Sequence, residues 1–413
     1  MPERRERVLR PSFVLALAGP LPGLLTRFEV VHVPIVWETA LYGVAILGAA
    51  FLLAWAAEVA QLDISQTLAI ATLALIAVLP EYAVDLFLAF RAGQGSERDR
   101  HLAVANMTGA NRLLIGIGWA LVVLIFWLKA GKREVRLRPE QRIDVGYLLL
   151  ATLWAFTIPL RGHLWWPDFV ILGALFVAYI LRAAKEEPEE PELIGAAAAL
   201  GTLPERTRRI AVVLLFLYSA AVILLVAEHF ADGLKAIGKD FGISQFFLIQ
   251  WVAPLASEAP EMIIAILFTL RLKAQNGLGT LISSKVNQWT LLVGTLWLVF
   301  AIGGGRAGEG AGFWNQMTMD SIQKEEVFLT AAQSVFAVAV ISSLSLNRWE
   351  ALALLVLFSA QFAIPDLRNA FAIAYIVLAI GLFAFSKETR LNLWDSLKTV
   401  VGRGSARRAA RSP

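Results

Sequence analysis

Long apolar runs constrain this chain more than any other feature of its sequence. A helix that crosses a bilayer needs roughly 20 mostly apolar residues, because its backbone amides find no water in the hydrocarbon core and must pair within the helix. Such runs recur along almost the whole chain and predict about eleven transmembrane helices. The predicted spans are residues 34–58, 65–90, 102–128, 145–160, 167–183, 209–229, 243–270, 278–301, 327–345, 349–364 and 370–386.

The composition agrees with an all-α membrane protein and excludes other classes. Only 17% of the 413 residues are charged, against about 25% in an ordinary soluble domain. The chain has no cysteine, which excludes disulfide frameworks, cysteine-ligated metals and thiol nucleophiles. No hydrolase pattern accompanies the apolar runs, and the one GxGxxG match, at residues 303–308, lacks the preceding strand and βαβ unit of a nucleotide site. We therefore expect neither an enzyme nor a resident cofactor, and no nucleic-acid partner.

The chain also repeats itself, because motifs in residues 34–183 recur in the same order in residues 209–364. Each half holds five predicted spans, an odd number, so the halves enter the membrane in opposite orientations. Such an inverted repeat is the architecture of secondary transporters. Four matched anchors carry the repeat: Ile64-Ser65-Gln66 with Ile243-Ser244-Gln245, Pro80-Glu81 with Pro260-Glu261, Leu113-Leu114-Ile115-Gly116 with Leu291-Leu292-Val293-Gly294, and Gln141-Arg142-Ile143-Asp144-Val145 with Gln323-Lys324-Glu325-Glu326-Val327.

Charges in the loops fit this inversion. Loop 129–142 holds six Lys and Arg residues and the tail after Phe385 holds seven, so both are expected to be cytoplasmic. The equivalent loop of the second half, 302–326, has two basic residues against four acids and is expected outside. The sequence thus predicts a multi-pass inner-membrane protein with a cytoplasmic tail.

These features divide the chain into six segments. The first, 1–33, is basic and contains a short apolar stretch at 13–25 that could be a half-span, an interfacial helix or a signal-like segment. The others are a first five-helix repeat at 34–183, a cytoplasmic linker at 184–208, a second five-helix repeat at 209–364, an extra transmembrane helix at 365–386 and a basic cytoplasmic tail at 387–413.

Four carboxylates lie inside otherwise apolar spans, namely Glu81, Asp85, Glu258 and Glu261. A carboxylate at the centre of a membrane helix costs about 2.5–3.5 kcal/mol even on the mildest insertion scale. The first pair is spaced i, i+4 and the second i, i+3, so each pair lies on one side of its helix. Inorganic cations or protons could offset this cost.

Two prolines stand beside these acids. Pro80 and Pro260 lack a backbone donor, so both helices are predicted to kink or break there. Carboxylates beside unwound carbonyls provide the oxygen ligands that hard cations need. Further candidate cation ligands are Ser257, Asn106, Asn111, Ser284, Asn287 and Gln288.

Two basic residues, Arg112 and Lys285, lie in the same part of the repeats. Either could be a charge partner or a proton site. On one interpretation the acids only pair with these bases and stabilise a helix bundle. Four buried acids against two buried bases nevertheless leave an excess of negative charge, which favours a cation or proton site.

The doubled motif resembles the Ca²⁺/cation antiporter superfamily of sodium/calcium exchangers. Residues 77–81, Ala-Val-Leu-Pro-Glu, and 257–261, Ser-Glu-Ala-Pro-Glu, are similar to the first conserved segment of its two repeats. Residues 105–111 and 283–288 are similar to the second segment. The resemblance covers nearly the whole chain and implies that Glu81 and Glu261 bind the exchanged cation.

The departures from that family pattern bear on the ions. Ala77 and Val78 replace two hydroxyl residues, and Lys285 stands where the family has an amide. These changes weaken the case for Na⁺/Ca²⁺ exchange and favour a proton-coupled variant. The resemblance implies a secondary antiporter that exchanges Ca²⁺ or another cation for Na⁺ or H⁺ by alternating access. The alternatives are a Na⁺/H⁺ exchanger without Ca²⁺ transport, or a non-transporting membrane scaffold on the same fold.

Overall fold

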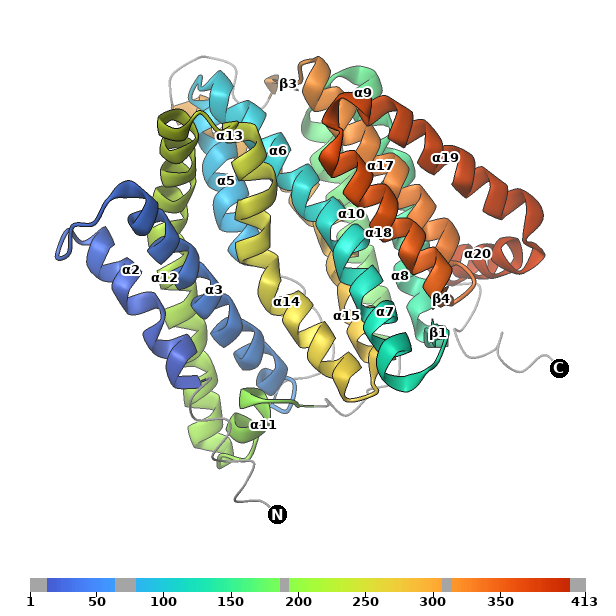
Figure 1. Ribbon diagram of the computed structural model, residues 1–413, viewed down its shortest axis with the longest axis horizontal. Coiled ribbons are helices and arrows are strands. Elements are labelled where there is room, and N and C mark those ends of the chain that lie inside the picture. Colours follow the sequence, from blue (N-terminus) through green and yellow to red (C-terminus); the bar gives the residue numbers. More distant parts are fainter. Residues whose placement is uncertain (1–12, 64–78, 186–192, 307–313, 402–413) are drawn as a thin grey trace. The chain divides into compact units, whose positions relative to one another are not determined.

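The structure, a computed structural model, describes residues 13–63, 79–185, 193–306 and 314–401. The anchor Ile64-Ser65-Gln66, the two positions Ala77 and Val78, and the end of the tail after residue 401 lie outside the described residues. Two compact units make up the chain, and each is described by itself. Unit 1 is Met1–Phe87 with Ala184–Pro260, and unit 2 is Leu88–Ala183 with Glu261–Pro413 (Figure 1).

Helices account for almost all of the described residues, in agreement with the predicted all-α class. Eight helical segments there are long and apolar enough to cross a membrane. The other three predicted spans correspond to α5 (Leu79–Gly93), α17 (Ser321–Ile341) and α18 (Arg348–Ala363), which are not among these eight. The total of eleven transmembrane helices therefore stays a prediction. The eight are Ile35–Ala60, Glu97–Ala130, Pro139–Arg161, Trp166–Ala183, Glu205–Phe241, Gln245–Leu270, Ala274–Gly305 and Pro365–Phe385.

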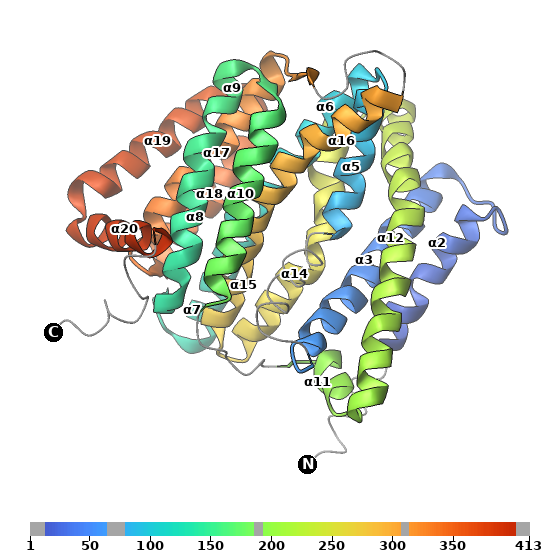
Figure 2. The same ribbon diagram turned by 180° about the vertical axis from the view of Figure 1, so that it is seen from behind.

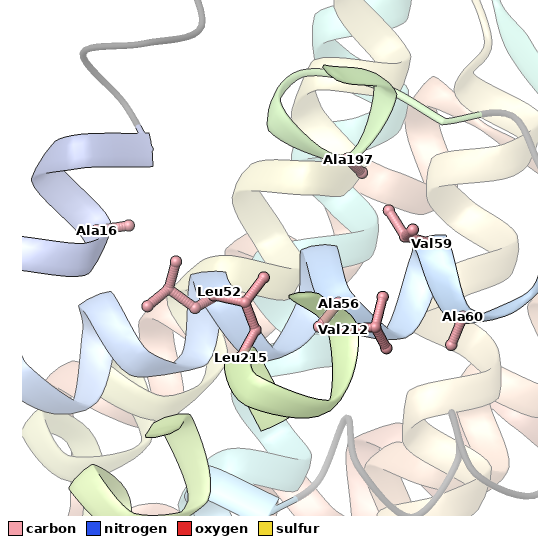
Figure 3. Packing of buried hydrophobic residues seen from close by; sticks show 8 residues of the cluster. All are labelled: Ala16, Leu52, Ala56, Val59, Ala60, Ala197, Val212 and Leu215. Carbon is pink, nitrogen blue, oxygen red and sulfur yellow. The ribbon is translucent and has the colours of Figure 1, made fainter. Parts of the chain in front are cut away.

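Unit 1 is organised by α3 (Ile35–Ala60) and α12 (Glu205–Phe241), which pack along each other. Their close approach depends on a residue without a side chain, because a Cβ on Gly233 would lie 2.1 Å from the Thr39 hydroxyl oxygen. Further along α3 an apolar cluster is buried (Figure 3). Its members are Ala16, Leu52, Ala56, Val59, Ala60, Ala197, Val212 and Leu215.

The ambiguous apolar stretch near the N-terminus is a helix in unit 1. It covers Phe13–Arg27, includes α2 (Pro20–Arg27), and is shorter than the eight segments able to cross a membrane. It packs against α3 and α12, and the Tyr218 hydroxyl donates to the Leu17 carbonyl at 3.0 Å. The segment is therefore a supporting helix of the unit 1 core.

The linker is tied to unit 1 by a short helix and an ion pair. Helix α11 (Ala196–Gly201) packs on α3. At the end of α3, both Asp63 carboxylate oxygens accept hydrogen bonds of 2.7 Å from Arg208. These bonds hold the pKa of Asp63 below its usual value. A lowered pKa means that the pair stabilises the folded unit at neutral pH and that this stabilisation is lost as the pH falls through the folded-state pKa.

Unit 2 holds most of the remaining helices (Figure 2). Two of its long helices contain π turns, in which one extra residue per turn is accommodated. One helix runs through α6, η1 and α7, and the other through α15, η4 and α16. The elements are α6 (Glu97–Leu113), η1 (Leu114–Trp119), α7 (Ala120–Ala130), α8 (Arg142–Ala155), α9 (Thr157–Arg161), α10 (Trp166–Ala183), α15 (Ala274–Asn287), η4 (Gln288–Leu292), α16 (Val293–Arg306), α17, α18, α19 (Arg368–Phe385) and α20 (Lys387–Val400).

Two short antiparallel strand pairs join loops of the two repeats within unit 2. Strand β1 (Glu134–Arg136) pairs with β4 (Ser345–Asn347), and β2 (His163–Leu164) pairs with β3 (Met317–Thr318). One membrane-crossing segment, Pro139–Arg161, separates β1 from β2. The two pairs therefore lie at opposite ends of these helices, β1 and β4 at one end and β3 at the other (Figure 1). Residues 134–136 of the first loop and 317–318 of the second thus lie at opposite ends of these helices, the arrangement that an inverted repeat requires.

The region assigned to a basic tail begins with an ordered helix. Helix α20 packs on α8, where a Cβ on Gly146 would lie 2.5 Å from Val400. Arg142, which the sequence analysis assigned to a basic loop, is buried and donates to Asn392 of α20 at 3.2 Å. The sequence analysis predicted no helix in this segment, whereas Lys387–Val400 is helical and packs on α8; its cytoplasmic location stays a prediction.

Gly116 provides a test of the packing in unit 2. A Cβ at this position would lie 2.3 Å from a ring carbon of Phe358, so Gly116→Ala should lower the free energy of unfolding by about 1–3 kcal/mol through overpacking. Gly173 of α10 is the matched control, because a Cβ there meets no atom within 4 Å. Thermal unfolding in detergent should show a loss for the first variant and none for the second. Equal unfolding temperatures for the Gly116→Ala and Gly173→Ala variants would contradict the packing of η1 against α18.

Candidate cation site

The first motif helix carries two acids on one face. Helix α5 places Glu81 and Asp85 one turn apart, and their side chains are 1% and 0% exposed. The residues before Leu79 are not described, so the predicted break at Pro80 stays a prediction. Both acids belong to unit 1. Their spacing presents two carboxylates to one neighbouring surface, as the sequence predicted.

The second motif helix, α14 (Ala253–Leu270), runs without a break through Pro260. The predicted break at Pro260 is wrong, because a membrane helix tolerates an internal proline when other groups satisfy the freed carbonyl. The irregular turn lies earlier, in η3 (Leu248–Val252), which is a π turn. Ser257 and Glu258 are buried, and the Ser257 hydroxyl donates to the Pro254 carbonyl at 3.2 Å.

In unit 2, Glu261 and Ser284 come together. The Ser284 hydroxyl of α15 donates to Glu261 Oε2. Glu261 Oε1 is buried and has no hydrogen-bond partner among the described residues, and the same holds for Asn287 Oδ1. Buried oxygens without donors are costly unless a ligand satisfies them. Carboxylate and amide oxygens are suitable ligands for a hard cation.

Lys285 has a different partner from the one that the sequence suggested. Its fully buried ammonium donates to Asn111 Oδ1 of α6 at 2.7 Å and lies 4.2 Å from the centre of the Trp289 ring. The Asn111 amide nitrogen donates to the Met107 carbonyl at 2.8 Å. Asn111 was predicted to be a cation ligand, but its oxygen already accepts from a protein cation in this conformation.

Two other predicted ligands occupy the same segments. Asn106 of α6 and Gln288 of η4 are both buried, at 1% and 0% exposure. Each of their helices continues into a π turn, η1 and η4. Such turns are frequent at functional sites because they locally change the backbone hydrogen bonds. The spacing of apolar residues in the sequence did not predict these π turns.

Arg112 pairs with an acid that the sequence analysis did not select. Its guanidinium donates to Glu326 of α17, which also accepts from Arg368 of α19. Glu326 was assigned to an outside loop, yet it lies in a helix and is 1% exposed. The sequence contained a signal that could have selected Glu326, because this residue lies in the repeated anchor at 323–327. Arg112 therefore has a structural role in joining α6, α17 and α19.

Among the described residues, no group of three or more His, Cys, Asp or Glu side chains is close enough together to hold a metal ion. The predicted site residues belong to two sets. Glu81, Asp85, Ser257 and Glu258 lie in unit 1. Asn106, Asn111, Arg112, Glu261, Ser284, Lys285, Asn287 and Gln288 lie in unit 2.

A family model accounts for most of the chain. The model described as sodium/calcium exchanger protein matches residues 35–185 and again 211–365. This chain belongs to the sodium/calcium exchanger family. The resemblance inferred from the doubled Pro-Glu motif is thereby confirmed. Together with the eight apolar helices, membership of this family makes the chain an integral membrane protein.

Solved structures of this exchanger family match as well. The H⁺/Ca²⁺ exchanger CAX is 41% identical, with a TM-score of 0.89 over 95% of this chain and 97% of that one. YfkE is 18% identical, with a TM-score of 0.58 over 91% and 99%. The sodium-calcium exchanger NCX_Mj is 19% identical, with a TM-score of 0.51 over 80% and 98%. The last two show a shared fold. No curated protein matches this chain.

The contact between Lys285 and Asn111 can be tested by a double-mutant cycle. Asn111→Leu keeps the side-chain size but removes an acceptor from the buried ammonium, so the free energy of unfolding should fall by about 1.5–3 kcal/mol. In a Lys285→Met background the same change should cost much less. Unfolding of the four proteins in detergent measures the coupling, and equal costs in both backgrounds would exclude the contact.

Proposed function

We propose that this exchanger exports or imports Ca²⁺ in exchange for H⁺ across the inner membrane. The observation that carries this proposal is the 41% identity to an H⁺/Ca²⁺ exchanger over 95% of the chain. The charges of the loops favour a cytoplasmic location for loop 129–142 and for the linker. Alternating access at the two Pro-Glu helices would move the ions.

Glu81 and Glu261 are the proposed cation-binding residues. Each follows the proline of a motif helix, one in each unit. The buried, unpartnered Oε1 of Glu261 supports the assignment, since a cation or a proton would satisfy it. Asp85, Glu258, Ser257, Asn106, Ser284, Asn287 and Gln288 are the proposed supporting ligands. A carboxylate that binds either a proton or a share of Ca²⁺ couples the two ions, because the same oxygen cannot hold both.

Lys285 supports coupling to H⁺ over coupling to Na⁺. Its ammonium lies within the second motif segment and donates to Asn111 Oδ1 at 2.7 Å. This bond takes up an amide oxygen that could otherwise coordinate a metal cation such as Na⁺. A proton bonds to a single carboxylate oxygen and needs no coordination shell, so the loss of this oxygen affects it less.

Flux through reconstituted vesicles tests the cation site. An imposed H⁺ gradient should drive Ca²⁺ uptake, and Glu81→Gln or Glu261→Gln should lower the rate by more than about tenfold, which corresponds to about 1.4 kcal/mol. Glu388→Gln, on the exposed face of α20, is the matched control and should transport normally. Transport that survives both motif changes would refute the site.

Replacing the H⁺ gradient by a Na⁺ gradient tests which ion is exchanged for Ca²⁺. With wild-type protein, a Na⁺ gradient alone should not drive Ca²⁺ uptake, and external Na⁺ should not inhibit uptake driven by H⁺. Lys285→Gln restores a neutral amide, so Na⁺ should then inhibit uptake in a concentration-dependent way. Proton flux driven by Na⁺ without Ca²⁺ movement would favour the Na⁺/H⁺ exchanger instead. The absence of both flux and ion-dependent thermal stabilisation would favour the scaffold.

A further inference from the structure

A further buried acid lies in unit 2, outside the Pro-Glu motif. Asp144, near the start of α8, is 7% exposed. Its Oδ1 accepts two hydrogen bonds of 2.8 Å, one from the Tyr179 hydroxyl of α10 and one from the Ser283 hydroxyl of α15. Both donors are neutral. None of the ion pairs in the described part of the chain includes Asp144.

The repeat provides an internal comparison for this acid. Asp144 and Glu326 occupy equivalent positions in the anchors at 141–145 and 323–327. Each acid reaches the second motif helix of the other repeat, Glu326 contacting α6 and Asp144 contacting α15. Two guanidinium groups, those of Arg112 and Arg368, form ion pairs with Glu326. The same position in the first repeat has kept the acid and has only hydroxyl partners.

None of the charged groups on the described elements that pack against α8 forms an ion pair with Asp144. Arg161 pairs with Asp168, Lys285 binds Asn111, and Arg142 binds Asn392. A carboxylate held only by neutral donors can take up a proton without breaking an ion pair. The remaining charged residues on those elements are Glu140 before α8, Arg182 on α10, Lys324, Glu325 and Glu326 on α17, and Lys387, Glu388, Arg390, Asp395 and Lys398 on α20.

A direct structural link joins Asp144 to the proposed cation site. Ser283 and Ser284 are neighbours on α15, and the first donates to Asp144 while the second donates to Glu261. A shift of α15 as a whole would move both hydroxyls at once, so this helix offers a route by which the protonation of Asp144 could be linked to the state of Glu261.

We propose that Asp144 is a second proton-exchanging acid of the transport cycle, with Tyr179 and Ser283 as its positioning residues. The carboxylate takes one proton from water in one conformation and returns it to water in the other, and no other bond forms or breaks. This inference rests on the proposed H⁺ coupling. It adds a proton carrier that lies outside both Pro-Glu motifs.

Counting protons tests the inference. Asp144→Asn keeps an oxygen acceptor for both hydroxyls but cannot titrate. The number of H⁺ moved per Ca²⁺, obtained from the pH gradient at which net flux stops, should fall by about one, since a protonated carboxyl carries one proton. The change in Ca²⁺ uptake with pH should become shallower. Tyr179→Phe should shift the pH profile and leave the stoichiometry unchanged.

Asp168→Asn is the matched control. Asp168 is a buried acid of the same unit, but it forms an ion pair with Arg161 at 2.6 Å. This variant should lower thermal stability without changing either the stoichiometry or the pH profile. If Asp144→Asn fails to fold, Ser283→Ala replaces it, because this change removes one of the two hydrogen bonds to Asp144. Acidification should produce a carboxylic C=O stretch in the infrared difference spectrum of both proteins. The band of Ser283→Ala should be shifted from that of wild type, and an unshifted band would contradict the inference.

The outcomes separate this inference from the proposed function. Wild-type vesicles without H⁺-driven Ca²⁺ flux would contradict both. Flux in wild type, with the same stoichiometry and pH profile in Asp144→Asn, would overturn the role of Asp144 alone. A fall by one in Asp144→Asn but not in Asp168→Asn would support it.

Discussion

A charge inside an apolar helix bundle needs a partner, and this requirement organises the described structure. The cost of an unpaired charge at membrane depth is several kcal/mol, and the two buried bases of the motif region are both bonded to residues on other helices. Lys285 joins α15 to α6 through Asn111, and Arg112 joins α6 to α17 through Glu326. Neither bond involves Glu261, whose buried Oε1 has no hydrogen-bond partner among the described residues.

The inverted repeat explains why the two halves resemble each other in framework and differ in charge. Framework features recur, including the π turns η1 and η4 and the strand pairs at the two ends of unit 2. Side chains at equivalent positions have diverged. Glu326 is held by two arginines, whereas Asp144 is held by a tyrosine and a serine. One framework thus supports ion pairs in one repeat and hydrogen bonds from neutral hydroxyls in the other.

The sequence was sufficient to predict the class, the repeat and the family, because apolar runs and the doubled Pro-Glu motif are local patterns. It did not predict the partners. Lys285 and Asn111 are far apart in the chain, and only packing brings them to 2.7 Å. Pro260 looked like a helix break because the local rule ignores neighbouring helices that can compensate for a missing donor. The helix α20 was missed because its polar sequence resembles a solvated tail, while its contacts with α8 depend on Gly146 and Arg142.

The strand pairs also constrain how the chain can be synthesised. Strands β1 and β2 belong to the first repeat, but their partners β4 and β3 belong to the second repeat, which is synthesised later. The first repeat must therefore enter the membrane with both loops unpaired and close them only once the second repeat has been made. Contacts between such distant residues slow folding. A half-protein that ends before β3 would retain two open strand edges, which are places where a second copy could pair.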